Sequence, residues 1–134
     1  MRKPSGEDHV KKIVHTENAP KPAGPYNQAI QAGKFLFVSG QLAIDPKEGK
    51  IVATDIKGQT ARVMENIQAI LQAAGYQLSD VVQANVYLSS MKLFSEFNTE
   101  YAKYFAKDFP ARATVGVELV PNALVEISVI AYKE

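Results

Sequence analysis

Apolar residues alternate with polar or small residues along two segments near the C-terminus. Between Ala113 and Leu119 the odd-numbered residues are apolar, and the even-numbered residues are small, polar or charged. The same alternation runs from Leu124 to Ala131, where valine, isoleucine and alanine occupy one side. A period of two is typical of a half-buried strand. Both segments are therefore predicted to be β-strands whose apolar sides face the core.

The polar sides of these two strands carry the candidate chemistry. Arg112 stands at the start of the first strand, after Pro110. We expect it to lie, with Thr114, on the face opposite the core. Glu126 and Ser128 occupy the polar side of the last strand. If both strands join one sheet, a guanidinium that can bind a carboxylate and a candidate general base share one surface. On the pattern alone, the favoured interpretation of Arg112 and Glu126 is that they are ordinary surface charges.

Two segments have the three-to-four spacing of amphipathic helices. The first helix is expected to begin at Thr54 or Asp55, which can cap it, and to end at Gly75 in a left-handed conformation. The second helix is expected to begin at Ser90 and to stop before Pro110. Its buried aromatic stripe consists of Phe94, Phe97, Tyr101, Tyr104 and Phe105.

The remaining patterns predict a short edge strand, a hairpin and one further strand. The edge strand covers residues 10–14, the two arms of the hairpin cover residues 26–31 and 34–42, and the further strand covers residues 80–88. Strict alternation places Gln41 on the polar face of the hairpin's second arm. It places Val82 on the apolar face of the further strand.

Two helices can cover only one face of a sheet this wide. The other face mixes apolar and polar side chains, so it is too apolar for water and too polar for a core. We therefore expect a symmetric oligomer in which this face forms a subunit interface with ligand pockets. The residues expected on it include Phe37, Ser39, Gln41, Val81, Gln83, Asn85, Tyr87, Arg112, Thr114 and Glu126.

Length and charge limit the class of protein. A chain of 134 residues suffices for one domain with a substantial core. Residues 10–134 are predicted to form that domain, after a flexible tail at residues 1–9. The 15 Lys and Arg residues nearly balance the 14 Asp and Glu residues. No overall field therefore attracts nucleic acid or an anionic membrane.

Several kinds of chemistry are not expected from this composition. The chain has no cysteine, which excludes disulfides and thiolate nucleophiles, and its only histidines are His9 and His15. Neither a metal site nor a Ser-His-Asp triad is expected. No apolar run is long enough to cross a bilayer, and the polar N-terminus lacks a signal-peptide core. We expect a soluble, cytoplasmic protein.

Several separated motifs, in order along the chain, resemble those of one known family. They are Thr16–Pro20 with Gly24–Tyr26, Ser39-Gly40-Gln41 with Asp45-Pro46, Gly75, Phe94 and Asn98, Pro110-Ala111-Arg112, and Val125-Glu126-Ile127. On these motifs the chain resembles the RidA/YjgF family of reactive-intermediate deaminases, also described as the L-PSP or translation-inhibitor family.

The resemblance implies a fold and a set of site residues. The fold is chorismate-mutase-like α+β, with a mixed six-stranded sheet, two helices on one face, and a homotrimer with clefts between subunits. Arg112 would bind the substrate carboxylate, and Glu126 would position or activate water. Thr114 stands where many members have cysteine, so a hydroxyl replaces the thiol there. The other residues implied to line the cleft are Tyr26, Ser39 and Asn98.

The implied activity is hydrolysis of small 2-imino or enamine acids to 2-oxo acids and ammonia. Substrates of this class include 2-aminoacrylate, 2-iminobutanoate and 2-iminopropanoate. No cofactor is expected, because the imine is already electrophilic. Two alternatives remain: the endoribonuclease or translation-inhibitor activity described for related proteins, and a non-catalytic trimer that binds small carboxylates. The near-neutral charge and the lack of a basic stripe argue against RNA as the partner.

Overall fold

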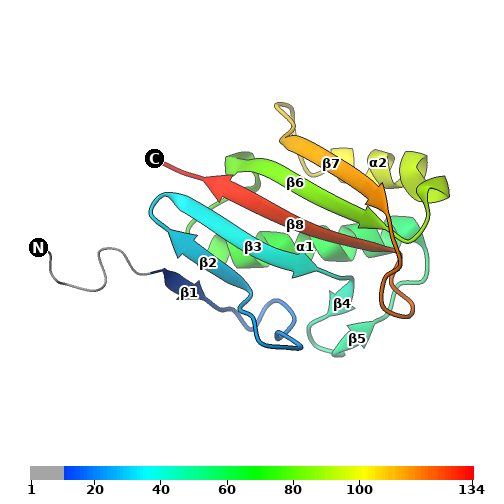
Figure 1. Ribbon diagram of the computed structural model, residues 1–134, viewed down its shortest axis with the longest axis horizontal. Helices are drawn as coiled ribbons and strands as arrows, with labels where there is room; N and C mark the ends of the chain where they lie inside the picture. The colour runs from blue at the N-terminus through cyan, green and yellow to red at the C-terminus, as the bar shows by residue number, and fades with distance from the viewer. Residues whose placement is uncertain (1–10) are drawn as a thin grey trace, which may run out of the picture.

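The computed structural model describes residues 11–134. They form a six-stranded sheet with α1 (Ile56–Ala73) and α2 (Phe94–Ala102) behind one face (Figure 1). β6 and β7 run parallel and all other neighbours in the sheet run antiparallel. The predicted mixed sheet with two helices on one face is confirmed, and the predicted tail lies outside the described residues. In order across the sheet, the strands are β1 (Lys12–Val14), β2 (Ala29–Ala32), β3 (Phe35–Gln41), β8 (Val125–Tyr132), β6 (Val81–Leu88) and β7 (Ala111–Gly116).

The longer helix, α1, begins and ends where its capping residues predict. The Asp55 carboxylate accepts a hydrogen bond of 3.0 Å from the Gly58 N–H. Beyond the other end, Gly75 has a φ of +83°, a conformation that favours glycine. The apolar side of α1 is buried against the sheet, with Val63 and Ile67 fully inaccessible. This helix supplies one side of the core.

The shorter helix, α2, carries a ladder of aromatic rings. A 3-10 turn, Met91–Leu93, precedes it, and the Ser90 hydroxyl caps this turn. The ring centroids of Phe97 and Tyr101 lie 5.3 Å apart, and those of Tyr101 and Phe105 lie 5.1 Å apart. Within residues 11–134, no helix has both the length and the apolar character that crossing a membrane requires.

A two-stranded hairpin and two β-bulges interrupt the regular pattern. The hairpin pairs β4 (Ile44–Asp45) with β5 (Lys50–Ile51). One bulge lies before Gln41 in β3 and the other at Val82 in β6. As a result Gln41 is buried and Val82 is exposed. The expected faces of both residues are wrong, because strict alternation cannot accommodate an inserted residue.

The edge strand β7 presents its two faces in the opposite sense to the prediction. Arg112 and Thr114 pair with Ala84 and Val86 of β6, which are core residues. Directly paired residues share a face of a sheet, so Arg112 and Thr114 lie on the face that the helices cover. The apolar side of β7 lies on the open face, where Val115 is 47% exposed. The prediction that Arg112 stands opposite the core is wrong, because nothing in residues 11–134 covers the apolar side of this strand.

A buried amide side chain connects α1 to the start of β8. Gln59, which is 1% exposed, donates hydrogen bonds to the carbonyl oxygens of Ala53 and Asn122. Its own oxygen accepts a bond of 2.8 Å from the Leu124 N–H. Because Leu124 immediately precedes β8, Gln59 fixes the segment that leads to Glu126.

Replacing Gln59 with leucine should lower the free energy of unfolding by about 3 kcal/mol. Two carbonyl groups and one N–H would lose a buried partner, and each loss is expected to be destabilising. Urea unfolding followed by circular dichroism measures the effect. The matched control is Gln72→Leu on the exposed side of the same helix, expected within about 0.5 kcal/mol of the wild type. Equal stabilities of the Gln59 variant and the wild type would contradict this account.

Candidate functional site

Arg112 lies against three aromatic rings of helix α2. Its Cζ atom is 5.7 Å from the ring centroid of Phe94, 5.5 Å from that of Phe97 and 5.0 Å from that of Tyr101. These distances are within the range of cation–π attraction. Arg112, on the edge strand β7, is half-buried. The helix therefore offers this cation an aromatic environment.

No carboxylate of the described residues neutralises Arg112. The ion pairs within residues 11–134 join His15 to Glu17, Lys34 to Glu134, Arg62 to Glu65 and Lys103 to Glu100. A half-buried charge without a partner is uncommon in a protein interior and is favourable for binding an anion. The fork of N–H donors of Arg112 therefore remains open to a ligand.

Unpaired polar atoms gather around the same arginine. The Asn98 Oδ1, the Tyr101 hydroxyl and the Thr114 Oγ1 are buried, and none has a hydrogen-bond partner among the described residues. Asn98 and Tyr101 are one turn apart on α2, and Thr114 follows Arg112 on the same face of β7. Each buried, unpaired polar atom is unfavourable, and such atoms are few in native structures. Their concentration here is typical of a binding site.

A small cavity opens beside this group. The volume of this cavity is ≈ 330 Å³. Its lining consists of Asn98, Tyr101, Ala102, Phe109, Pro110 and Arg112. Burial raises the pKa of the Tyr101 hydroxyl, although the neighbouring Arg112 acts in the opposite direction. The phenol thus stays neutral at physiological pH. We call Asn98, Arg112 and Thr114, with the rings of Phe94, Phe97 and Tyr101, the arginine cluster.

Glu126 lies in a second group of polar residues, on the open face of the sheet. It pairs with Tyr87 of β6, two positions from Ser128 on the same side of β8. A cavity of ≈ 360 Å³ is lined there by Gly40, Tyr87, Val117, Glu118, Leu119, Glu126 and Ser128. Burial raises the pKa of the Glu126 carboxyl above its ordinary value. A raised pKa brings a carboxylate closer to the pH at which a general base works best.

Gly40, in the bulge of β3, lies next to Glu126. A Cβ atom added to Gly40 would collide with the Glu126 carboxylate, which would have to move from its present position. The Ser39 hydroxyl donates a bond of 2.6 Å to the Asn27 carbonyl oxygen. Gly40 also lines a smaller cavity with Tyr26, whose ring is 49% exposed. We call Tyr26, Ser39, Gly40 and Glu126 the glutamate cluster.

The predicted site residues thus form two groups within the chain. Asn98, Arg112 and Thr114 lie on the helix-covered face, whereas Glu126 and Ser128 lie on the open face. The prediction that Arg112 and Glu126 share one face is wrong, because Arg112 aligns with Ala84 and Glu126 with Tyr87 across β6. One sheet separates the two functional groups.

Sequence reasoning missed two features of these clusters. Phe97 and Tyr101 were recognisable only as part of a buried stripe, and nothing in the sequence placed them against Arg112. Gly40 was quoted only within a motif, because its contact with Glu126 joins residues that are distant in the sequence.

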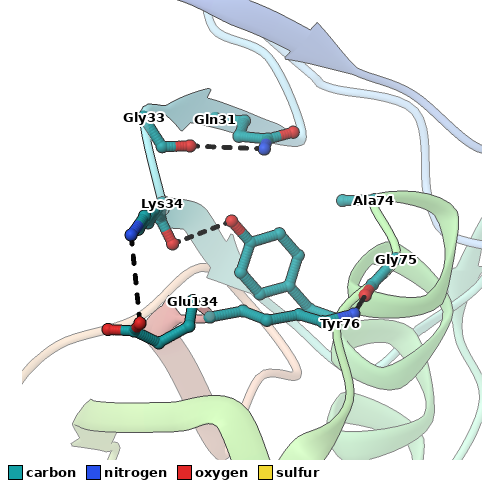
Figure 2. A pocket seen from close by; sticks show the side chains of 8 residues that line it. Gln31, Gly33, Lys34, Ala74, Gly75, Tyr76 and Glu134 are labelled. Atoms are coloured by element: carbon teal, nitrogen blue, oxygen red, sulfur yellow. Dashed lines mark hydrogen bonds and ion pairs between the residues drawn. The ribbon is translucent and has the colours of Figure 1, made fainter.

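Another cavity, of ≈ 370 Å³, lies between the β2–β3 turn, the end of α1 and the C-terminal residues (Figure 2). Its polar groups bond to one another. The Tyr76 hydroxyl donates to the Lys34 carbonyl oxygen at 2.9 Å, and the Lys133 ammonium donates to the Gly75 carbonyl oxygen at 2.7 Å. Figure 2 also shows Lys34 beside Glu134, with 4.0 Å between their charged atoms. This cavity is held together by internal bonds and offers no unpaired group comparable to Arg112.

The fold is that of a small α+β domain, and its arginine cluster is a candidate site for an anionic ligand. Residues 16–133 match the sequence profile of the family described as "Endoribonuclease L-PSP". The chain belongs to this family, whose members include proteins named RidA, YjgF and RutC. Family membership confirms the resemblance drawn from the motifs.

Individual relatives are similar over nearly their whole length. A RutC family protein of Pyrococcus horikoshii is 56% identical over 126 residues, which are 93% of this chain and 100% of the relative. The crystal structure of RidA from an Antarctic Psychrobacter has a TM-score of 0.87 and 37% identity, over 91% of this chain and 99% of that one. The structure of Escherichia coli TdcF with bound serine has a TM-score of 0.87 and 33% identity, over 92% of this chain and 99% of that one.

Replacing Gly40 with alanine should displace the Glu126 carboxylate and lower any activity that depends on it by about tenfold or more, since small misplacements of a catalytic group are costly. The matched control is the same substitution in a Glu126→Ala background, where the added Cβ meets no carboxylate. The clash is measured by thermal unfolding of four proteins: the wild type, each of the two single variants, and the double variant. A destabilisation by Gly40→Ala that is equally large in both backgrounds would contradict the assigned contact.

Proposed function

We propose that the protein hydrolyses small 2-imino acids to 2-oxo acids and ammonia, in a site shared between neighbouring copies of the chain. The observation that carries the proposal is the half-buried Arg112 guanidinium, which has no carboxylate partner among the described residues and is surrounded by unpaired polar atoms. The relative TdcF binds serine, which also carries a carboxylate beside a nitrogen-bearing carbon. A 2-imino acid has the same arrangement of groups.

Arg112 binds the substrate in this proposal. Its guanidinium donates two hydrogen bonds to the carboxylate and thereby fixes the adjacent imine carbon. The cavity beside it is of a size that admits a small acid, at ≈ 330 Å³. Asn98 and Thr114 provide further polar atoms near the bound molecule.

Glu126 acts on water. Its carboxylate accepts a proton from water while the water oxygen bonds to the imine carbon, and the imine nitrogen takes up a proton from solvent, which the final loss of the hydroxyl proton balances; the product is a tetrahedral carbinolamine. Glu126 then returns its proton to the nitrogen. The C–N bond breaks, ammonia leaves, and loss of the hydroxyl proton completes the 2-oxo acid. The raised pKa of Glu126 suits both directions of proton transfer.

The two clusters need a second copy of the chain to meet. Arg112 and Glu126 lie on opposite faces of one sheet, so one chain does not present both to a small substrate. The open face also carries large apolar side chains, with Phe37 44% and Val115 47% exposed. A homotrimer in which β7 of one chain packs beside the open face of the next would cover these residues and join the clusters.

Ribonuclease activity is the function that the family description names. It is not proposed here, because the observations favour a small ligand. The formal net charge is +1, which provides little of the electrostatic attraction on which RNA binding depends.

The direct test is 2-oxo acid formation from 2-iminobutanoate generated in situ, with the protein in catalytic amount. Arg112→Ala should lose both carboxylate binding and acceleration, whereas Glu126→Gln should still bind 2-oxobutanoate but turn over about a hundredfold or more slowly. Activity of the wild type should rise with pH through the raised pKa of Glu126, since the base must be deprotonated.

Acceleration by the wild type that both variants retain would refute the assigned roles. No acceleration by a correctly folded wild type that still binds 2-oxobutanoate would refute the deaminase and leave a carboxylate-binding protein.

A further inference from the structure

The three rings around Arg112 differ in burial, and this difference allows them to be tested separately. Phe97 and Tyr101 are 0% and 4% exposed, whereas Phe94 is only partly buried. All three come from α2, each about one helical turn from the next, and they contact the same cation, Arg112 on β7. The rings are therefore part of a rigid helix that is packed against the core.

Aromatic rings stabilise a cation without occupying its hydrogen-bond donors. The attraction arises from the ring quadrupole, whereas a carboxylate partner would take up the N–H groups that a ligand needs. The one buried carboxylate of α2, Glu100, pairs with Lys103 at 3.0 Å and not with Arg112. The helix thus presents rings to Arg112 and directs its buried carboxylate elsewhere.

We propose that Phe94, Phe97 and Tyr101 form an aromatic platform that holds Arg112 as an oriented, unpaired cation and thereby sets the affinity of the site for its carboxylate ligand. The platform residues are positioning residues, because they act through Arg112. The proposal rests on the proposed function for the identity of the ligand. It requires only that Arg112 bind a small carboxylate.

The platform explains why an arginine at this place needs no counter-ion. Three ring contacts offset part of the desolvation of the half-buried guanidinium. They also restrict its rotation, so less side-chain entropy is lost when a carboxylate binds. If the rings served only to pack the core, replacing one ring with another apolar group would leave the affinity for carboxylates unchanged.

The experiment measures binding of 2-oxobutanoate by titration calorimetry and, separately, kcat and KM for 2-iminobutanoate. Tyr101→Leu and Phe94→Leu each remove one ring, and Tyr101→Phe removes only the hydroxyl. The matched control is Tyr104→Leu, since Tyr104 lies on the same aromatic stripe but not against Arg112. All variants are first compared with the wild type by circular dichroism and by oligomeric state.

Each leucine variant at the platform should raise Kd and KM by about tenfold, because one cation–π contact is lost, with kcat changed by less than about twofold. Tyr101→Phe and Tyr104→Leu should bind within about twofold of the wild type. The Arg112 Nε–H resonance, identified by its loss in Arg112→Lys, should also move toward the position of a solvent-exposed arginine when a ring is removed.

Unchanged Kd in folded Phe94→Leu and Tyr101→Leu would overturn the platform. So would an equal loss in Tyr101→Phe and Tyr101→Leu, which would assign the effect to the hydroxyl. If Tyr101→Leu does not fold, the result for the partly buried Phe94 decides the question. Wild-type protein that binds 2-oxobutanoate but deaminates nothing would refute the proposed function and leave the platform standing, whereas deamination with ring-independent affinity would refute the platform alone.

Discussion

The central feature of the structure is a cation, Arg112, that no carboxylate of residues 11–134 neutralises. Arg112 sits on an edge strand, half-buried between solvent and the rings of α2. Its neighbours Asn98 and Thr114 also hold buried polar atoms without partners. Such an arrangement is unfavourable for stability and favourable for binding, because an anionic ligand can supply the missing interactions. The rest of the fold holds this group in place: the aromatic ladder of α2 packs into the core, and β6 fixes the register of β7.

The sheet determines which side chains of the same chain can lie near Arg112. By strand register, Arg112 faces the helices and Glu126 faces away from them. The bulge in β3 brings Gly40 against Glu126, and partial burial raises the pKa of that carboxyl. The proposed binding group and the proposed proton-transfer group thus lie on two sides of one sheet. In the proposed assembly, further copies of the chain would cover the exposed apolar side chains of the open face and complete the site.

Much of the fold could be predicted from the sequence, since local signals were strong. Asp55 and Gly75 mark the ends of α1, and period-two alternation marks β6 and β8. The faces of β7 could not be predicted in this way. Alternation shows which residues of a strand share a side, and the apolar side is usually assigned to the core. In β7 the apolar side, with Val115, points away from the core of its own chain, and an arginine is tolerated beside the helix because aromatic rings surround it. Arg112 and Glu126 were identified as candidates, but their separation by the sheet depends on long-range pairing that no local pattern records.

The measurement that tests the shared site most directly is complementation between inactive variants. Arg112→Ala and Glu126→Gln chains are mixed in equal amounts in denaturant, refolded together, and assayed for 2-oxo acid formation beside each variant refolded alone. If each site takes Arg112 from one chain and Glu126 from its neighbour, random assembly gives about one site in four with both groups intact, and about a quarter of wild-type activity should return. A mixture as inactive as its two components, although co-assembled, would contradict the account and place both groups within one chain.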